Sequence, residues 1–163
     1  MEKEHIVSRM SILGHPIHPM LIHFPVAALL GLIATDIAFV MTGDVFWARA
    51  GWWLAGIGMA GGWLSGSVGL LDLIIVSQIR RLVVAWCHAL IAVMLLSLAT
   101  LNWFLRLDAP AELIQPWGLY LSLLTGLLIT VTSLLGGELV YDHAVGVSPD
   151  KMAKRRHRAR NHP

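Results

Sequence analysis

Charged residues are scarce in this chain. They make up 13% of its 163 residues, about half of the roughly 25% that is usual in soluble domains. So few charged side chains cannot keep a whole protein surface hydrated, which excludes an ordinary soluble globular protein. The single cysteine, Cys87, excludes an internal disulfide and says little about the redox compartment.

Long apolar runs are abundant instead. Hydrophobic residues make up 56% of the chain, and its mean hydropathy is +0.69. Four runs are long enough for a helix that crosses a bilayer, which takes about 20 residues. The predicted spans are residues 19–41, 47–76, 82–105 and 116–140. The second run exceeds the thickness of the hydrocarbon, so its helix should tilt or project.

The connections between these runs are short, which predicts that neighbouring helices are antiparallel. The sequence therefore indicates an all-α fold, an integral membrane up-down four-helix bundle at residues 19–141. Residues 1–18 are interpreted as an N-terminal segment and residues 142–163 as a basic tail. The N-terminus does not read as a signal peptide, because the first apolar run starts late and continues too far.

Lysine and arginine are distributed unevenly about the predicted bundle. Ten of the 12 lie on the side of both termini, whereas Arg49 and Arg106 lie on the other side. The positive-inside rule then places both termini in the cytoplasm. The tail adds a basic segment at residues 151–160, but no folded basic domain accompanies it, so no nucleic-acid binding is expected.

Every predicted span carries an ionisable side chain near its cytoplasmic end. His23 and His88 lie a few residues inside the first and third spans, about 6–9 Å below the boundary at 1.5 Å per residue. Asp72 lies near the end of the second span, and Glu138 and His143 lie near the end of the fourth. Because such groups are costly in lipid and usually face the bundle interior, we expect His23, Asp72 and His88 to converge.

The first span is entered through the stretch "GHPIHPMLIHFPV", residues 14–26. Residues that precede proline are pushed toward extended conformations, so residues 14–19 are predicted to form a non-helical lip. This lip should place His15 and His18 over the end of the bundle. Pro25 has no N–H, so the carbonyl of Leu21 lacks its usual helical donor. Backbone with an unpaired carbonyl is tolerated at membrane depth only where it lies against protein or a cavity.

Structural roles for these polar residues are the alternative. Asp72 could pair with Arg80 or Arg81, and interfacial histidines could bind freed carbonyls or headgroups. Asp36, in the other leaflet, is interpreted as a structural partner of Arg49 or Asn102.

The second span carries glycines at helical spacing, Gly58, Gly62, Gly66 and Gly69. Such a ridge of small residues predicts close helix packing. It would also admit a flat cofactor.

Four segments together, "GHPIHPMLIHFPVAALL", "SGSVGLLDL", "CHALIAVML" and "GGELVYDHAVGV", resemble the uncharacterised bacterial membrane family called domain of unknown function 2231. The resemblance covers residues 14–147 and implies four membrane helices, a location in the bacterial inner membrane and no assigned activity. The family's motif positions fall on His15, His18, His23, Asp72, His88, Gly136, Gly137 and Tyr141.

Haem b is the first cofactor that these residues suit, in a protein that transfers electrons. Haem iron takes imidazole ligands from facing helices, and His23 and His88 lie at matching depth. Arg80 and Arg81 could neutralise the propionates at the cytoplasmic surface. The matching depth makes this the favoured hypothesis.

A transition metal ion, zinc, iron or manganese, is the second hypothesis, for binding or permeation. Imidazole and carboxylate suit such ions, and the candidate ligands outnumber those that haem needs: His15, His18, His23, Asp72, His88 and His143. No H-E-x-x-H motif occurs, so no known hydrolase class is indicated and the sequence assigns no enzymatic activity.

The third hypothesis is a non-catalytic subunit of a larger membrane complex. Its polar cluster would then dock redox partner proteins or a second copy of the chain. Beyond these, membrane lipid is the only partner that the composition itself implies.

Overall fold

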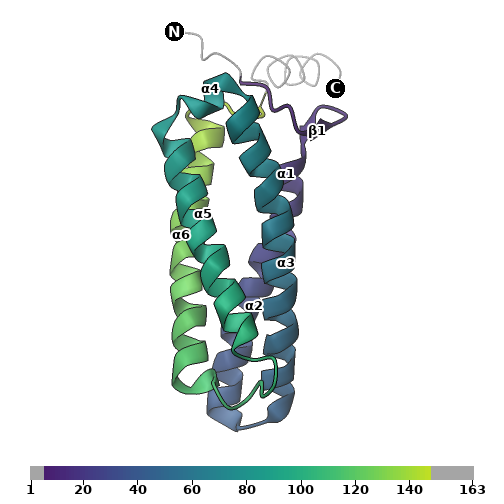
Figure 1. The fold of residues 1–163 in the computed structure, drawn as a ribbon, viewed down its shortest axis with the longest axis vertical. Helices are drawn as coiled ribbons and strands as arrows, with labels where there is room; N and C mark the ends of the chain where they lie inside the picture. Colours follow the sequence, from purple (N-terminus) through teal and green to yellow (C-terminus); the bar gives the residue numbers. More distant parts are fainter. Residues whose placement is uncertain (1–5, 148–163) are drawn as a thin grey trace, which may run out of the picture.

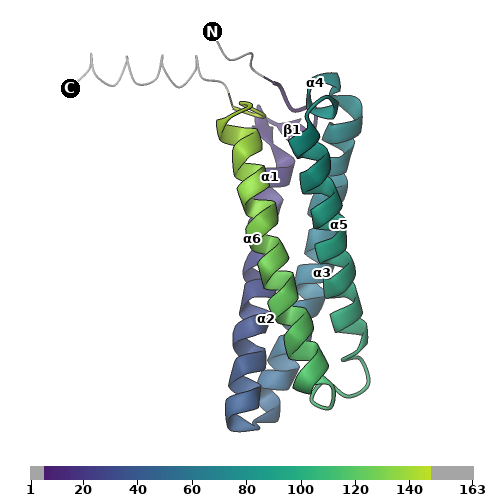
Figure 2. The ribbon, with the colours of Figure 1, turned by 90° about the vertical axis from the view of Figure 1, so that its left-hand side faces the viewer.

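A computed structural model describes residues 6–147, so Lys3 and the basic segment at 151–160 lie outside the described residues. The four long helical segments run up and down side by side (Figures 1 and 2). In chain order the elements are β1 (Ser11–Ile12), β2 (His15–Pro16), α1 (Ile17–Leu21), α2 (His23–Thr42), α3 (Val45–Ile75), α4 (Ser77–Arg80), α5 (Val83–Phe104), the π-helix η1 (Ile114–Gly118) and α6 (Leu119–Tyr141).

The predicted fold class is confirmed. The segments Ile17–Thr42, Val45–Ile75, Val83–Phe104 and Ile114–Tyr141 are each long and apolar enough to cross a membrane. At most a third of each segment's apolar stretch is buried inside the bundle, and every segment carries exposed large apolar side chains, among them Leu30, Trp63, Leu90 and Leu127. Helices that are hydrophobic all round and yet exposed in the isolated chain are typical of lipid-facing spans.

The two ends of the bundle differ in structure. The termini end carries the β1–β2 hairpin, α4 and the last turn of α6, whereas the loop end carries the α2–α3 and α5–η1 connections (Figure 1). At the loop end Gly43 takes the left-handed conformation, with φ 69°, and so ends α2. The carboxylate of Asp44 then accepts a hydrogen bond from the N–H of Phe46 at 2.9 Å and so caps α3.

Small residues let the helices approach closely in the middle of the bundle. A Cβ added at Gly58 would lie 2.5 Å from Cγ of Leu29, and one added at Gly62 would overlap the side chain of Leu96. The glycine ridge is thus confirmed as a packing surface at these two positions. It adjoins the first of two apolar clusters, the central cluster: Leu29, Leu32, Ala55, Leu95, Leu96, Ala99 and Ile129.

A second apolar cluster closes the termini end. It joins the N-terminal segment to three helices and is called the termini cluster: Ile6, Leu73, Val76, Ile79 and Ala85. The termini cluster and the central cluster are separated by about three helical turns along α5, from Ala85 to Leu95, and by about five turns along α3, from Leu73 to Ala55.

The predicted lip is only partly right. Residues 11–16 form an extended hairpin, with Leu13 and Gly14 at positive φ in its turn. Helix α1, however, begins at Ile17, whereas the sequence predicted non-helical backbone as far as residue 19. Pro19 lies in the first turn of α1, where a backbone N–H has no helical acceptor, so proline costs nothing there.

Candidate functional site

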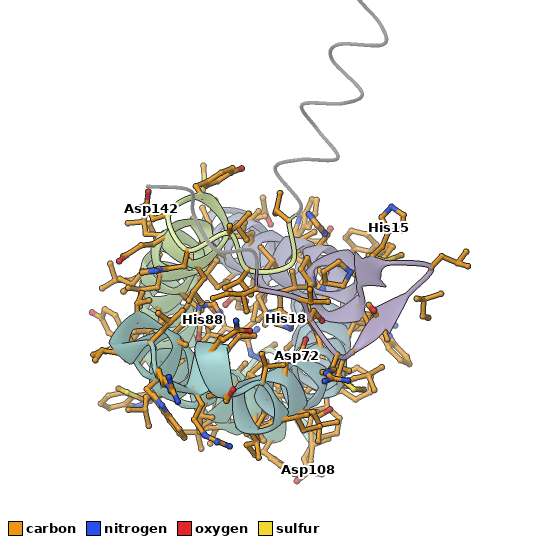
Figure 3. The ribbon with its side chains drawn as sticks, turned by 90° about the horizontal axis from the view of Figure 1, so that it is seen from above. His15, His18, Asp72, His88, Asp108 and Asp142 are labelled. Carbon is orange, nitrogen blue, oxygen red and sulfur yellow. The ribbon has the colours of Figure 1, made fainter. Side chains whose placement is uncertain are left out.

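Two histidines from different helices lie next to each other toward the termini end. His18 belongs to α1 and His88 to α5, and both lie in the interior of the bundle in the end view (Figure 3). Their ring centroids are 6.3 Å apart and their planes are perpendicular. Both side chains are half-buried, so the bundle supplies most of their surroundings.

The ring of His18 is fixed against α3 by one residue. Its Nδ1 lies 2.8 Å from the carbonyl oxygen of Ser65 and 3.1 Å from the Ser65 hydroxyl. That hydroxyl also donates to the carbonyl of His18 at 3.3 Å. A Cβ at Gly69 would lie 3.0 Å from Nδ1, so the glycine one turn beyond Ser65 provides the room for the imidazole.

The ring of His88 is fixed against α6 in a similar way. Its Nδ1 lies 3.0 Å from the carbonyl oxygen of Thr132. A Cβ at Gly136 would lie 3.2 Å from Cε1 of the ring. Each histidine therefore has a carbonyl partner and, one turn further along the same neighbouring helix, a glycine that makes space for it.

The carbonyl contacts decide which nitrogen carries the proton. A carbonyl oxygen can only accept a hydrogen bond, so Nδ1 must be the protonated nitrogen in neutral His18 and neutral His88. The lone pair is then on Nε2 in both rings. Histidines that bind metals are commonly held in this form, with the non-ligating N–H donated to a carbonyl or carboxylate.

Small and polar residues surround the two rings. We call this set the histidine layer: His18, Ser65, Gly69, His88, Thr132 and Gly136. On α5 it lies between Ala85 of the termini cluster and Leu95 of the central cluster. The α5–α6 pair and the α1–α3 pair diverge toward this end of the molecule (Figure 1).

The sequence predicted the wrong partner for His88. His23 is exposed on α2 and His15 is exposed on the hairpin, where it points away from the bundle (Figure 3). His18 takes the interior position, because α1 already begins at Ile17. A step of five residues turns a helix by about 140°, so His18 and His23 point in different directions.

The other predicted ligands do not join the histidine pair. Asp72 binds Ser8 and the main-chain N–H groups of residues 9 and 10 instead of converging with His88. Nor does it pair with Arg80, whose guanidinium donates to the carbonyl of Ile74 at 2.7 Å. Arg81 is exposed, and His143 is half-buried beyond the end of α6. Within residues 6–147, no three histidine, cysteine, aspartate or glutamate side chains are grouped as a metal site would require.

A second buried polar group lies at the loop end. The guanidinium of Arg106 donates to both carboxylate oxygens of Asp36, at 2.6 and 2.7 Å, and both side chains are 0% exposed. Nε of Arg106 donates to Asn102, whose amide donates to the hydroxyl of Ser122 at 3.0 Å. The expected pairing of Asp36 with Arg49 is wrong, since Arg49 is exposed, and Asn102 contacts the carboxylate only through Arg106 and Ser122.

The sequence family can now be compared with this geometry. The family described as "Predicted membrane protein (DUF2231)" matches residues 14–149. The chain belongs to this family. The resemblance seen in its motifs is thereby confirmed, and the matched region of DUF2231 contains both buried polar groups. The comparisons with curated proteins and with solved structures give no match.

Membership in DUF2231 identifies the chain as a membrane protein and leaves its chemistry to the residues themselves. Sequence reasoning missed two contributions to the site. The carbonyl of Thr132 is a main-chain group that any residue would supply. Ser65, by contrast, precedes Gly69 by one turn on the glycine ridge, and that spacing could have suggested it.

Proposed function

We propose that this membrane protein binds haem b between His18 and His88 and transfers electrons. The observation that carries the proposal is the pair of Nδ1–carbonyl contacts, because they leave Nε2 of both rings free to bind iron. Haem b supplies one-electron chemistry when two imidazoles hold its iron.

The separation of the rings supports the same assignment. Two metal–nitrogen bonds of about 2 Å each, together with the two ring radii, separate coaxial imidazole centroids by about 6 Å. The centroids of His18 and His88 are 6.3 Å apart. The glycines of the histidine layer, Gly69 and Gly136, let the two imidazoles lie between the helices at this separation. Arg80 and Arg81, exposed at the same end, would suit the propionates.

The charge distribution supports an orientation in a bacterial inner membrane with both termini in the cytoplasm. Of the two arginines on the opposite side, Arg106 is buried against Asp36, which neutralises its charge. Arg49 is then the one exposed arginine at the loop end within the described residues. The positive-inside bias is therefore stronger than the count of residues suggests.

The absorption spectrum of the purified protein tests the haem. The protein, expressed with ample haem, should show a Soret band that His18→Ala and His88→Ala each abolish. His23→Ala is the matched control, because His23 is an exposed histidine close in sequence, and it should leave the band unchanged. A colourless protein with stoichiometric zinc or iron would favour the metal-ion hypothesis. A protein with neither would favour a docking subunit.

A further inference from the structure

Residues 6–10 cross the termini end of the bundle, and we call them the N-terminal strap. Ile6 forms a parallel bridge with Val145, and its carbonyl accepts a hydrogen bond from the N–H of Gly146 at 2.9 Å. The side chain of Ile6 is 8% exposed and belongs to the termini cluster. The strap is therefore packed onto the bundle as part of the structure.

One carboxylate holds the middle of this strap. Asp72, 8% exposed near the end of α3, accepts hydrogen bonds from the hydroxyl of Ser8 and from the N–H groups of Arg9, at 2.8 Å, and Met10, at 3.0 Å. Both carboxylate oxygens are used, and bonds to an ionised acceptor are about twice as strong as neutral ones. The partners come from a segment more than 60 positions away in the chain.

The strap lies on the aqueous side of the histidine pair. Ile6 packs in the termini cluster with Ala85, and Ala85 lies one helical turn before His88 on α5. A strap that leaves the bundle end removes Ile6 from the termini cluster, which lies between the aqueous end and the histidine layer on α5.

We propose that Asp72 is a latch that holds the N-terminal strap in place and so controls the access of water and polar ligands to the His18–His88 pair. Without the carboxylate, the Ser8 hydroxyl and two N–H groups lose their acceptor and are satisfied better by water. The strap is then retained by Ile6, by the Gly146 contact and by the hydrogen bond from the N–H of Ile17 to the carbonyl of Met10 at its far end. The purpose of this access rests on the proposed haem site, whereas the control of access by the strap does not depend on haem.

Cysteine labelling measures the position of the strap. In a Cys87→Ser background, Ala85→Cys reports on the termini cluster that Ile6 of the strap helps to form, because Ala85 is 4% exposed. Ser77→Cys, at an exposed position of α4, is the accessible reference. Ala48→Cys, at a 0% exposed position near the loop end, reports global unfolding. Each is treated with a membrane-impermeant maleimide in detergent-purified full-length protein.

We expect position 85 to react at least about tenfold more slowly than position 77, and Asp72→Ala to remove most of that difference. Arg9→Ala is the matched control, since Arg9 contributes only its main-chain N–H, and it should leave the rate unchanged. Position 48 should stay unlabelled throughout. A rate at position 85 that Asp72→Ala leaves unchanged overturns the proposal.

If Asp72→Ala makes position 48 reactive as well, that variant is unfolded, and Ser8→Ala tests the latch instead. It removes a single hydroxyl donor and should accelerate labelling at position 85 to an intermediate degree; no acceleration overturns the latch. These rates require no cofactor. A protein that lacks a Soret band but responds at position 85 refutes the haem alone, and a haem protein that does not respond refutes the latch alone.

Discussion

Arg106 and Asp36 form a buried ion pair between the segment that follows α5 and the middle of α2. Both nitrogens at the tip of the guanidinium donate to the carboxylate, one to each oxygen, and neither side chain is exposed. The hydroxyl of Ser122 donates to the same carboxylate, so the pair also joins α6. Hydrogen bonds at this group therefore join three of the four spans, and Gly51 of the fourth, α3, packs against the pair.

Breaking this ion pair should destabilise the protein. Removing one partner of a buried pair leaves an uncompensated charge and costs about 3–5 kcal/mol, so Asp36→Ala and Arg106→Ala should each lower the unfolding midpoint in detergent. The double variant Asp36→Leu/Arg106→Met removes both charges and should be more stable than either single variant. Asp108→Ala, an exposed acid in the nearby loop, is the control. A single variant as stable as this control would contradict the assigned role.

The glycine ridge can be tested with two neighbouring positions. Gly58→Ala places a methyl group 2.5 Å from Cγ of Leu29, which is itself fully buried. It should reduce stability by about 1–3 kcal/mol, as overpacking does. Gly61→Ala meets its nearest atom, in Pro25, at an ordinary 3.5 Å, and should be neutral or slightly stabilising because alanine favours helix. Equal thermal stability of the two variants would argue against close packing at Gly58.

Reporter fusions test the orientation of the protein in the membrane. A reporter active only in the cytoplasm should work after residue 147, and one active only in the periplasm should work in the loops around Asp44 and Asp108. The physical reason is the excess of lysine and arginine at the termini end. Periplasmic activity at the C-terminus would reverse the assignment, and the histidine pair would then lie near the outer surface.

Ser65 should act as a positioning residue for His18. Ser65→Ala keeps the carbonyl contact but loses the hydroxyl at 3.1 Å from Nδ1. Loss of such outer partners commonly weakens metal binding by about 10–100-fold, so we expect at least about tenfold weaker haem affinity and a shifted reduction midpoint. Ser67→Ala, whose exposed hydroxyl binds the carbonyl of Leu64, should change neither quantity. An unchanged midpoint in Ser65→Ala would show that the carbonyl alone orients the ring.

The four spans could be predicted because each depends on local composition, namely a long run of apolar residues with few charges. The interior position of His88 could be predicted too, since a histidine in mid-helix has few inexpensive places in lipid. The choice between His18 and His23 depended on where the first helix begins. Proline is compatible with both a lip and a first helical turn, so the sequence alone did not decide it.

The partners of Asp72 and Arg106 were beyond prediction for another reason. Asp72 binds a segment more than 60 positions away, and two of its three donors are main-chain N–H groups that carry no signature in the sequence. Arg106 lies 70 positions from Asp36, and a charge just beyond a span ordinarily indicates a solvated boundary. Only the arrangement of the helices brings these groups together.

The placement of the ion pair has a mechanical consequence. Separating α5 and α6 from α2 at the loop end would break the Arg106–Asp36 pair inside the bundle, whereas the termini end is held by the apolar termini cluster and the hydrogen bonds of the strap. The ion pair is therefore a point about which the helices can pivot at the loop end. A small rotation about the ion pair is amplified along the helix, and His88 lies 18 residues from Arg106, a lever of about 27 Å at 1.5 Å per residue.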